Sequence, residues 1–146
     1  EQRLEAPIIE ALESGIPTLG ICVGMHILFE SSEEDPDIAG LGILRGSITK
    51  LKTAEFFPNI HMQWNQIESG SLEDRFFYFA HRYGLELDFN LLDDPVMKFA
   101  ATSFGCSEFV SHIQVGRITV CQFHPENSGS AGLHYLRNFL EGEHDD

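Results

Sequence analysis

Basic residues are scarce in this chain. Its 146 residues include 9 Lys and Arg against 23 Asp and Glu, which gives a formal net charge of −14. Because nucleic acids are bound by basic surfaces, this balance argues against a nucleic-acid partner. Most of the acidic excess is expected to be solvated surface, although such a charge can also aid docking onto a basic partner subunit.

Long hydrophobic runs are absent as well. No apolar stretch approaches the roughly 18 residues that a membrane span requires, and no charged segment followed by an apolar one opens the chain. We therefore expect no membrane partner and no secretory signal, and a cytoplasmic setting.

Cysteine is also rare. The three cysteines are odd in number and lack the spacing of a disulfide framework. Cys121 lies within an apolar strand pattern and Cys106 follows a turn-like stretch, so both are interpreted as structural thiols. The Cys and His positions show no paired metal-ligand spacing, and we expect neither a metal nor another cofactor.

The apolar pattern alternates between helical and strand-like periods. Helical spacing of Leu4, Ile8, Ile9 and Leu12 predicts a helix over residues 1–14 that ends at Gly15. Further helices are predicted at 25–30 and 130–140, and strands at 18–21, 47–51, 63–68, 75–80, 96–103, 108–115 and 117–123. The sequence therefore predicts a single α/β domain over residues 1–146, with added antiparallel pairing in its second half.

The most informative segment surrounds Cys22. Residues 18–21 predict a short strand and a helix follows, so Cys22 falls at the turn between them with Gly20 and Gly24 on either side. Glycines allow the tight backbone that holds a nucleophile exposed at the carboxyl end of a sheet. A helix N-terminus and an imidazolium neighbour can lower a thiol pKa from about 8.5 to roughly 3.5–7.5. We expect Cys22 to be a nucleophile with thiolate character.

His124 is the natural base for that nucleophile. It follows an apolar strand and precedes Pro125, and Glu126 lies two residues further on. A carboxylate there can accept the second ring N–H of His124, which fixes its tautomer and stabilises an imidazolium. Each motif alone is weak, but together they indicate a cysteine hydrolase with the order Cys22, His124, Glu126.

These motifs carry a family resemblance. Residues 20–25 together with 122–126 resemble the class I glutamine amidotransferases, whose glutaminase domain uses a Cys-His-Glu triad. Further stretches are similar to one branch of that family, the glutaminase subunits of imidazole glycerol phosphate synthase. These stretches are residues 28–34, 40–46, 61–65, 78–81, 128–129 and 136–139.

The resemblance implies a flavodoxin-like sheet with helices on both faces. It also implies hydrolysis of L-glutamine to glutamate and ammonia, with the ammonia passed to a cyclase or synthase subunit in a heterodimer for histidine biosynthesis. His26, His81, Arg82 and Tyr83 fall where the family holds its substrate. The partner-facing segment corresponds to His61, Met62, Gln63, Trp64 and Asn65, although Met62 and Trp64 can equally be read as core residues.

Three positions depart from the family pattern. His26 stands where the family has Gln, Arg82 where it has Ser or Thr, and Gln63 where it has Gly. An imidazole presents different donors and acceptors from an amide, and a guanidinium can pair with a carboxylate or close the pocket by its bulk. His26 can also be a satisfied helix histidine, and Arg82 a surface cation.

The start of the chain also differs from the family pattern, because the sequence opens in a helix that leads directly into the nucleophile strand. In the family, earlier strands and a glycine loop come first, and that loop supplies one oxyanion-hole donor. Here only the backbone N–H of Val23 can be named as a donor. We therefore expect an incomplete, N-terminally truncated domain that is inactive and poorly soluble by itself.

Two other functions remain open. A paralogous amidotransferase that supplies ammonia for the amidated sugars of surface polysaccharides fits the departures at His26, Gln63 and Arg82. A non-catalytic binding subunit that has kept the triad but lost its glutamine pocket fits them too.

Overall fold

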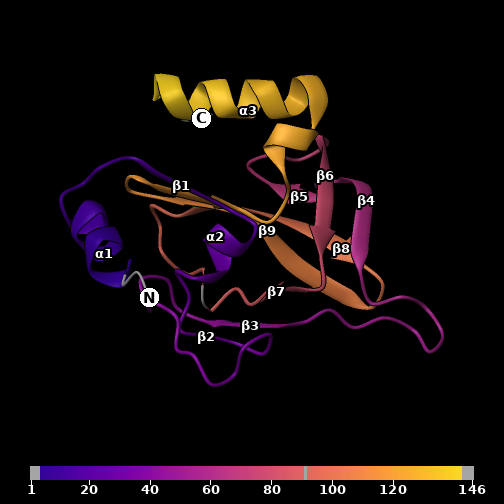
Figure 1. Ribbon diagram of the computed structural model, residues 1–146. Helices are drawn as coiled ribbons and strands as arrows, with labels where there is room; N and C mark the ends of the chain where they lie inside the picture. The colour runs from indigo at the N-terminus through magenta and orange to yellow at the C-terminus, as the bar shows by residue number, and fades with distance from the viewer. Residues whose placement is uncertain (1–3, 91, 143–146) are drawn as a thin grey trace.

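The computed structural model describes residues 4–90 and 92–142. Strands dominate the middle of the chain, and helices lie near its two ends (Figure 1). The elements follow in the order α1 (Glu5–Glu13), β1 (Thr18–Ile21), α2 (Val23–His26), β2 (Ser31–Ser32), β3 (Ser47–Lys50), β4 (His61–Gln66), β5 (Ser69–Gly70), β6 (Phe76–His81), β7 (Tyr83–Glu86), β8 (Lys98–Phe104), β9 (Ser107–Val115), β10 (Ile118–Cys121), the 3-10 helix η1 (Pro125–Asn127) and α3 (Gly129–Glu141).

Within the described residues, the main sheet has eight strands in the order β1-β10-β9-β7-β3-β2, with β8 and β5 branching from β9. The pairs β1–β10 and β2–β3 are parallel, whereas the other pairs of this sheet are antiparallel. Strands β4 and β6 form a separate antiparallel pair. Antiparallel pairing in the second half of the chain is therefore confirmed.

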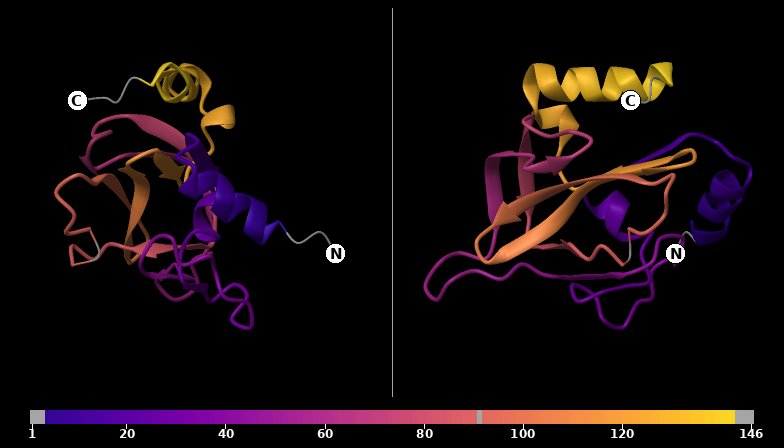
Figure 2. Two further views of the ribbon diagram at one scale, coloured as in Figure 1. Left: turned by 90° about the vertical axis from the view of Figure 1, so that its left-hand side faces the viewer. Right: turned by 180° about the vertical axis from the view of Figure 1, so that it is seen from behind.

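Two apolar clusters lie on opposite faces of the sheet. Successive residues of β10 point to opposite faces, so Val120 joins one cluster and Cys121 the other. The first cluster contains Met25 of α2, and the second contains Phe77, Phe123 and Tyr135. Figures 1 and 2 show α3 on one side of the strands and α2 on the other. The α/β prediction with helices on both faces is confirmed.

Most strand predictions are confirmed with small shifts at their ends. β4 begins two residues before the predicted strand 63–68, and β10 ends two residues before the predicted 123. Strands β2, β5 and β7 were not predicted, and β2 and β5 are only two residues long. Such lengths are too short to show a hydrophobic period.

The first helix agrees with its prediction where the structure describes it. α1 ends at Glu13, and Gly15 adopts a left-handed φ of +74°. Glycine takes this conformation without a Cβ penalty, as expected at a helix C-terminus. The predicted helical residues 1–3 lie outside the described residues. No helix in residues 4–90 and 92–142 combines the length and hydrophobicity needed to cross a bilayer.

The predicted helix at 25–30 is wrong. α2 ends at His26, and the chain then bends away from a helical path. The following carbonyls bond to a distant loop: Leu41 N–H donates to Ile27 O at 2.8 Å, and Leu44 N–H donates to Leu28 O at 2.9 Å. These tertiary hydrogen bonds replace the helical ones, so local helix propensity at this segment is overridden.

Candidate active site

Cys22 lies at a strained turn between β1 and α2. Its backbone has φ +51° and ψ −107°, a conformation that costs a residue with a side chain about 1–3 kcal/mol. The turn is held from both sides, because the Cys22 N–H donates to Cys121 O at 2.8 Å and the Cys22 carbonyl accepts from Met25 N–H at 2.9 Å. The strand-turn-helix setting predicted for this residue is confirmed.

The two flanking glycines have different roles. A Cβ at Gly20 would lie 2.6 Å from the carbonyl oxygen of Gly24, whereas a Cβ at Gly24 would meet nothing within 4 Å. Only Gly20 is therefore required by the close approach of strand and helix.

His124 follows β10 and is fixed through its backbone and its ring. Its N–H donates to Tyr78 O at 2.8 Å, and its Nδ1 lies 2.6 Å from Oε1 of Glu126. Since a carboxylate only accepts, Nδ1 carries a proton, and in the neutral tautomer Nε2 has the lone pair. This tautomer suits a general base at Nε2.

The sheet brings the two motifs to the same edge. β1 and β10 are adjacent and parallel, and Ile21 is paired with Cys121, so both chains leave the sheet side by side. The Cys22 sulfur lies 3.6 Å from Nε2 of Gln122 and 3.9 Å from the carbonyl oxygen of Ala80. Among the described residues, no hydrogen bond joins Cys22 to His124.

The thiol differs from the expected thiolate. Burial raises the pKa of Cys22 above its ordinary value, and the carboxylates of Glu34 and Glu126 raise it further. Hydrogen bonds to the Val23 backbone and the Gln122 side chain act in the opposite direction but do not reverse the shift. The four-residue α2 does not outweigh burial, and the resting sulfur is a thiol.

His26 lies one turn after Cys22 and is 8% exposed. Its Nε2 is 2.7 Å from Oε1 of Gln122, while its Nδ1 is buried without a hydrogen-bond partner. Burial lowers the pKa of His26, although the hydrogen bond to Gln122 and the charge of Glu34 act to raise it. His26 is therefore not the fully satisfied helix histidine of the alternative interpretation.

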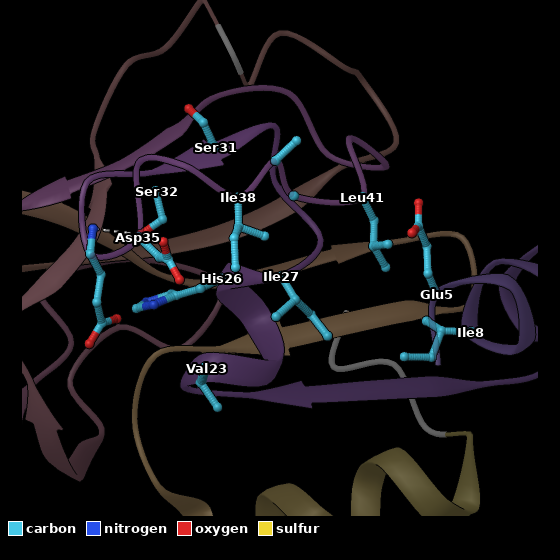
Figure 3. A pocket seen from close by; sticks show the side chains of 13 residues that line it. Glu5, Ile8, Val23, His26, Ile27, Ser31, Ser32, Asp35, Ile38 and Leu41 are labelled. Atoms are coloured by element: carbon cyan, nitrogen blue, oxygen red, sulfur yellow. Dashed lines mark hydrogen bonds between the residues drawn. The ribbon is translucent and has the colours of Figure 1, made fainter. Parts of the chain in front are cut away.

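A hollow of about 580 Å³ opens beside α2 (Figure 3). Val23 and His26 form one wall, and the loop after β2 forms another. In Figure 3 the His26 side chain extends from α2 toward Ser32 and Asp35. The hollow is lined by Glu5, Ile8, Val23, His26, Ile27, Ser31, Ser32, Glu34, Asp35, Ile38, Ala39, Gly40 and Leu41.

The other predicted substrate residues lie outside this lining. Arg82 is exposed, and Tyr83 lies on β7, where it packs against the apolar cluster that contains Met25. His81 is buried, and both of its ring nitrogens are occupied by His61 and by the carbonyl oxygen of Tyr83. The structure thus brings His26, but not Arg82 or Tyr83, to the hollow that Val23 lines, and neither Cys22 nor His124 is among its lining residues.

The predicted partner-facing segment forms β4. Met62 is 57% exposed, Trp64 is 51% exposed, and Gln63 is also exposed, so the interpretation of Met62 and Trp64 as core residues is wrong. His61 is fully buried, and Asn65 bonds its Nε2 at 3.1 Å. The segment therefore has an outward surface of Met62, Gln63 and Trp64 and an inward pair, His61 and Asn65.

Sequence reasoning gave no role to Gln122 or Glu34. Gln122 connects the sulfur of Cys22 to His26, and Glu34 lines the hollow while its charge acts on both of those residues. The position of Gln122, directly before the Phe-His-Pro-Glu run and directly after strand β10, which pairs with β1, was the available signal.

Known proteins share the sequence and the fold of this chain. Residues 2–142 match the family described as glutamine amidotransferase class-I. The chain is 38% identical over 141 residues to the imidazole glycerol phosphate synthase subunit HisH of Deinococcus radiodurans, covering 91% of this chain and 63% of that protein. The identity to the HisH subunit of Methanocaldococcus jannaschii is also 38%, over 94% of this chain and 70% of that protein.

The fold has a solved counterpart. A crystal structure of a glutamine amidotransferase superposes with a TM-score of 0.59 at 18% identity, covering 94% of this chain and 67% of the other. That similarity supports the shared fold, and the family match covers nearly the whole sequence. The chain belongs to the class I glutamine amidotransferases.

Proposed function

We propose that this chain is the glutaminase component of an imidazole glycerol phosphate synthase, in which it hydrolyses L-glutamine to glutamate and ammonia. The observation that carries the proposal is the strained Cys22 turn beside the hydrogen-bonded His124–Glu126 pair, at the shared edge of β1 and β10. The names of the relatives support the choice of synthase.

In the proposed first step, the sulfur of Cys22 attacks the side-chain amide carbon of glutamine. Because the resting sulfur is a protonated thiol, Nε2 of His124 takes its proton as the attack proceeds. The backbone N–H of Val23 stabilises the oxyanion. His124 then returns the proton to the leaving nitrogen, and ammonia departs from a γ-glutamyl thioester.

In the second step, water attacks the thioester carbonyl. Nε2 of His124 removes a proton from that water, glutamate leaves, and the sulfur regains its proton. Glu126 stabilises the imidazolium in both steps, because its carboxylate accepts the Nδ1 hydrogen bond at 2.6 Å.

The ammonia is passed to a synthase subunit that docks on β4. Exposed Met62 and Trp64 support this position, since aromatic and Met side chains are enriched at protein interfaces. A closed transfer route is required, because free ammonia becomes protonated in bulk water. The net charge of −14 suits a partner with a basic docking face.

Glutamate release from L-glutamine, measured with and without a cyclase subunit of this synthase, tests the proposal. We expect activity that disappears in Cys22→Ser and persists in the control Cys106→Ser, since Cys106 is exposed and does not line the hollow. The only Trp of the chain, Trp64, reports docking by fluorescence, and its emission should shift when the partner is added. A wild-type chain that binds the cyclase but releases no glutamate would contradict the proposal.

Two observations favour a non-catalytic binding subunit as the second candidate. The thiol pKa is raised, and in the described residues Cys22 has no hydrogen bond to His124. A glutamine-like electrophile separates the two functions, because it forms a covalent bond to Cys22 only if the sulfur can be activated. Absence of labelling in the presence of the cyclase subunit favours the binding subunit.

A further inference from the structure

Ser128 occupies the N-cap position of α3, but its side chain makes no hydrogen bond to that helix. At an N-cap, a Ser hydroxyl ordinarily accepts a hydrogen bond from a backbone N–H of the first helical turn. Ser128 is only 1% exposed, so its hydroxyl is not turned to solvent either. The hydroxyl therefore has partners outside the helix that it precedes.

Those partners are the backbones of His124 and Tyr78. The Oγ of Ser128 accepts from the Tyr78 N–H at 2.9 Å and donates to the His124 carbonyl oxygen at 2.6 Å. These directions are fixed, because an N–H can only donate and a carbonyl oxygen can only accept. The His124 N–H donates in turn to the Tyr78 carbonyl oxygen at 2.8 Å. Three hydrogen bonds thus form a closed network, the Tyr78–His124–Ser128 network.

This network fixes the backbone of the proposed general base against β6. β10 ends at Cys121, and in the described residues the strand pairing of β6 is with β4 alone. The segment after β10 also packs on β6 through Phe77 and Phe123, whose ring centroids are 3.9 Å apart. Stacking of that kind tolerates sliding, whereas hydrogen bonds fix distance and direction. Both backbone polar groups of Tyr78 are used for this purpose.

The opposite side of Ser128 is held by α3. A Cβ at Gly132 would lie 1.9 Å from the carbonyl oxygen of Pro125 and 2.9 Å from Cβ of Ser128. The Gly132 N–H also donates to the Ser128 carbonyl oxygen at 3.1 Å. Because Gly132 permits this close approach, the helix holds Ser128 in place while the hydroxyl of Ser128 holds His124.

We propose that Ser128 is a positioning residue for His124 in the glutaminase reaction. The proposal deepens that function and rests on it for the chemistry that His124 performs. The hydroxyl contacts the backbone of His124 and not its imidazole, so it acts through His124. A displacement of about 1 Å at a reacting group can lower a rate by about 10²-fold, so small freedom of this backbone has a large effect on turnover.

Ser128→Ala tests the proposal, because it removes the hydroxyl and leaves the Tyr78 N–H without its acceptor. Steady-state glutaminase kinetics are measured in the presence of the cyclase subunit. We expect kcat to fall about 10- to 100-fold and KM to change less than about twofold, since Ser128 does not line the hollow. Ser128→Thr keeps a hydroxyl and should recover most of the loss. An unchanged kcat in Ser128→Ala would overturn the proposal.

Thr102→Val is the matched control. Thr102 is fully buried on β8, and its hydroxyl donates to the Ser111 hydroxyl at 3.1 Å. Both variants lose one buried hydroxyl, so thermal melting should show similar losses of stability, but only Ser128→Ala should lose turnover. Equal losses of kcat would show that Ser128 acts through stability alone. If Ser128→Ala does not fold, Ser128→Cys replaces it, because a thiol donates and accepts more weakly than a hydroxyl and should give a partial loss of kcat.

A proton NMR measurement separates this inference from the glutaminase function, because it needs no turnover. The proton that Nδ1 of His124 shares with Oε1 of Glu126, across 2.6 Å, should give a downfield resonance. We expect that resonance to stay sharp in Thr102→Val and to broaden in Ser128→Ala, where the His124 backbone is no longer fixed. If the wild-type chain releases no glutamate, this broadening supports the role of Ser128 while hydrolysis is contradicted. An unchanged resonance in a folded Ser128→Ala chain overturns the role of Ser128.

Discussion

The side-chain amide of Gln122 lies with its Nε2 3.6 Å from the sulfur of Cys22, and the two residues directly follow the adjacent parallel strands β10 and β1. This contact is one of two hydrogen bonds that lower the thiol pKa against the effect of burial. The amide therefore contributes to sulfur reactivity.

Replacing Gln122→Glu should slow alkylation of Cys22. The carboxylate can still accept from His26, but it removes the donor to the sulfur and adds a negative charge that raises the thiol pKa. If the thiol pKa rises by about one, the thiolate fraction below that pKa falls roughly tenfold, so iodoacetamide labelling near pH 8 should slow by about tenfold.

The labelling is measured in a Cys106→Ser background, because Cys106 is exposed and would react as well. Cys121 is fully buried with a raised pKa and does not interfere. Gln63→Glu, at an exposed position of β4, adds the same charge away from the sulfur and should leave the rate unchanged. Identical rates for both variants would show that Gln122 does not act on the thiol.

The two glycines beside Cys22 offer a matched pair for stability. Gly20→Ala should lower the free energy of unfolding by roughly 1–3 kcal/mol or more, because its Cβ would lie 2.6 Å from Gly24 O and 2.9 Å from Gly24 C. Gly24→Ala has open space and should be neutral or stabilise by up to about 1 kcal/mol, since Ala favours helix. Urea unfolding of both variants measures the difference, and similar losses would refute the distinction.

Local chemistry made the turn at Cys22 and the pair His124–Glu126 predictable. The turn involves only a glycine-flanked cysteine between a strand and a helix, and the hydrogen-bonded pair only a histidine at a strand end and a carboxylate two residues later. The conformation of each motif is therefore determined within a few residues. Likewise, α3 was predicted within one residue at each end, because its apolar face repeats over several turns.

Features that depend on distant residues were not predictable. The end of α2 is set by the loop that bonds Ile27 and Leu28, and the raised pKa of Cys22 follows from burial by the whole fold. The link from Cys22 through Gln122 to His26 also joins residues about 100 positions apart. No local pattern encodes such contacts, so the expectation of a resting thiolate was wrong.

Removing the charge of Glu126 should impair turnover more than substrate binding. In Glu126→Gln the amide can donate to Nδ1 of His124 and so favour the wrong tautomer, which leaves no lone pair on Nε2. We expect kcat to fall by about 10²- to 10⁴-fold with little change in KM, because Glu126 does not line the hollow.

The control for this experiment is Glu55→Gln, which removes the same charge from an exposed loop residue. Steady-state glutaminase kinetics of both variants in the presence of the synthase subunit provide the comparison. An unchanged kcat in Glu126→Gln would remove this residue from the catalytic machinery.

The buried histidines of β4 and β6 should make the fold sensitive to acid. Nδ1 of His61 lies 2.9 Å from Nε2 of His81, whose Nδ1 donates to Tyr83 O at 2.8 Å. Burial lowers the pKa of His61 to about 4 and that of His81 to about 3. Both rings are therefore neutral in the folded chain at pH values where the unfolded chain, with His pKa near 6.5, binds protons.

The free energy of unfolding should then fall as the pH decreases from about 6.5 toward 4, because protonation favours the unfolded chain in this interval. Each ring should contribute on the order of 3 kcal/mol to this loss. Urea unfolding at several pH values measures the slope, and the double variant His61→Gln with His81→Gln should have a smaller one. His134→Gln, at an exposed position of α3, should keep the wild-type slope, and a double variant with that same slope would assign the acid sensitivity to carboxylates instead.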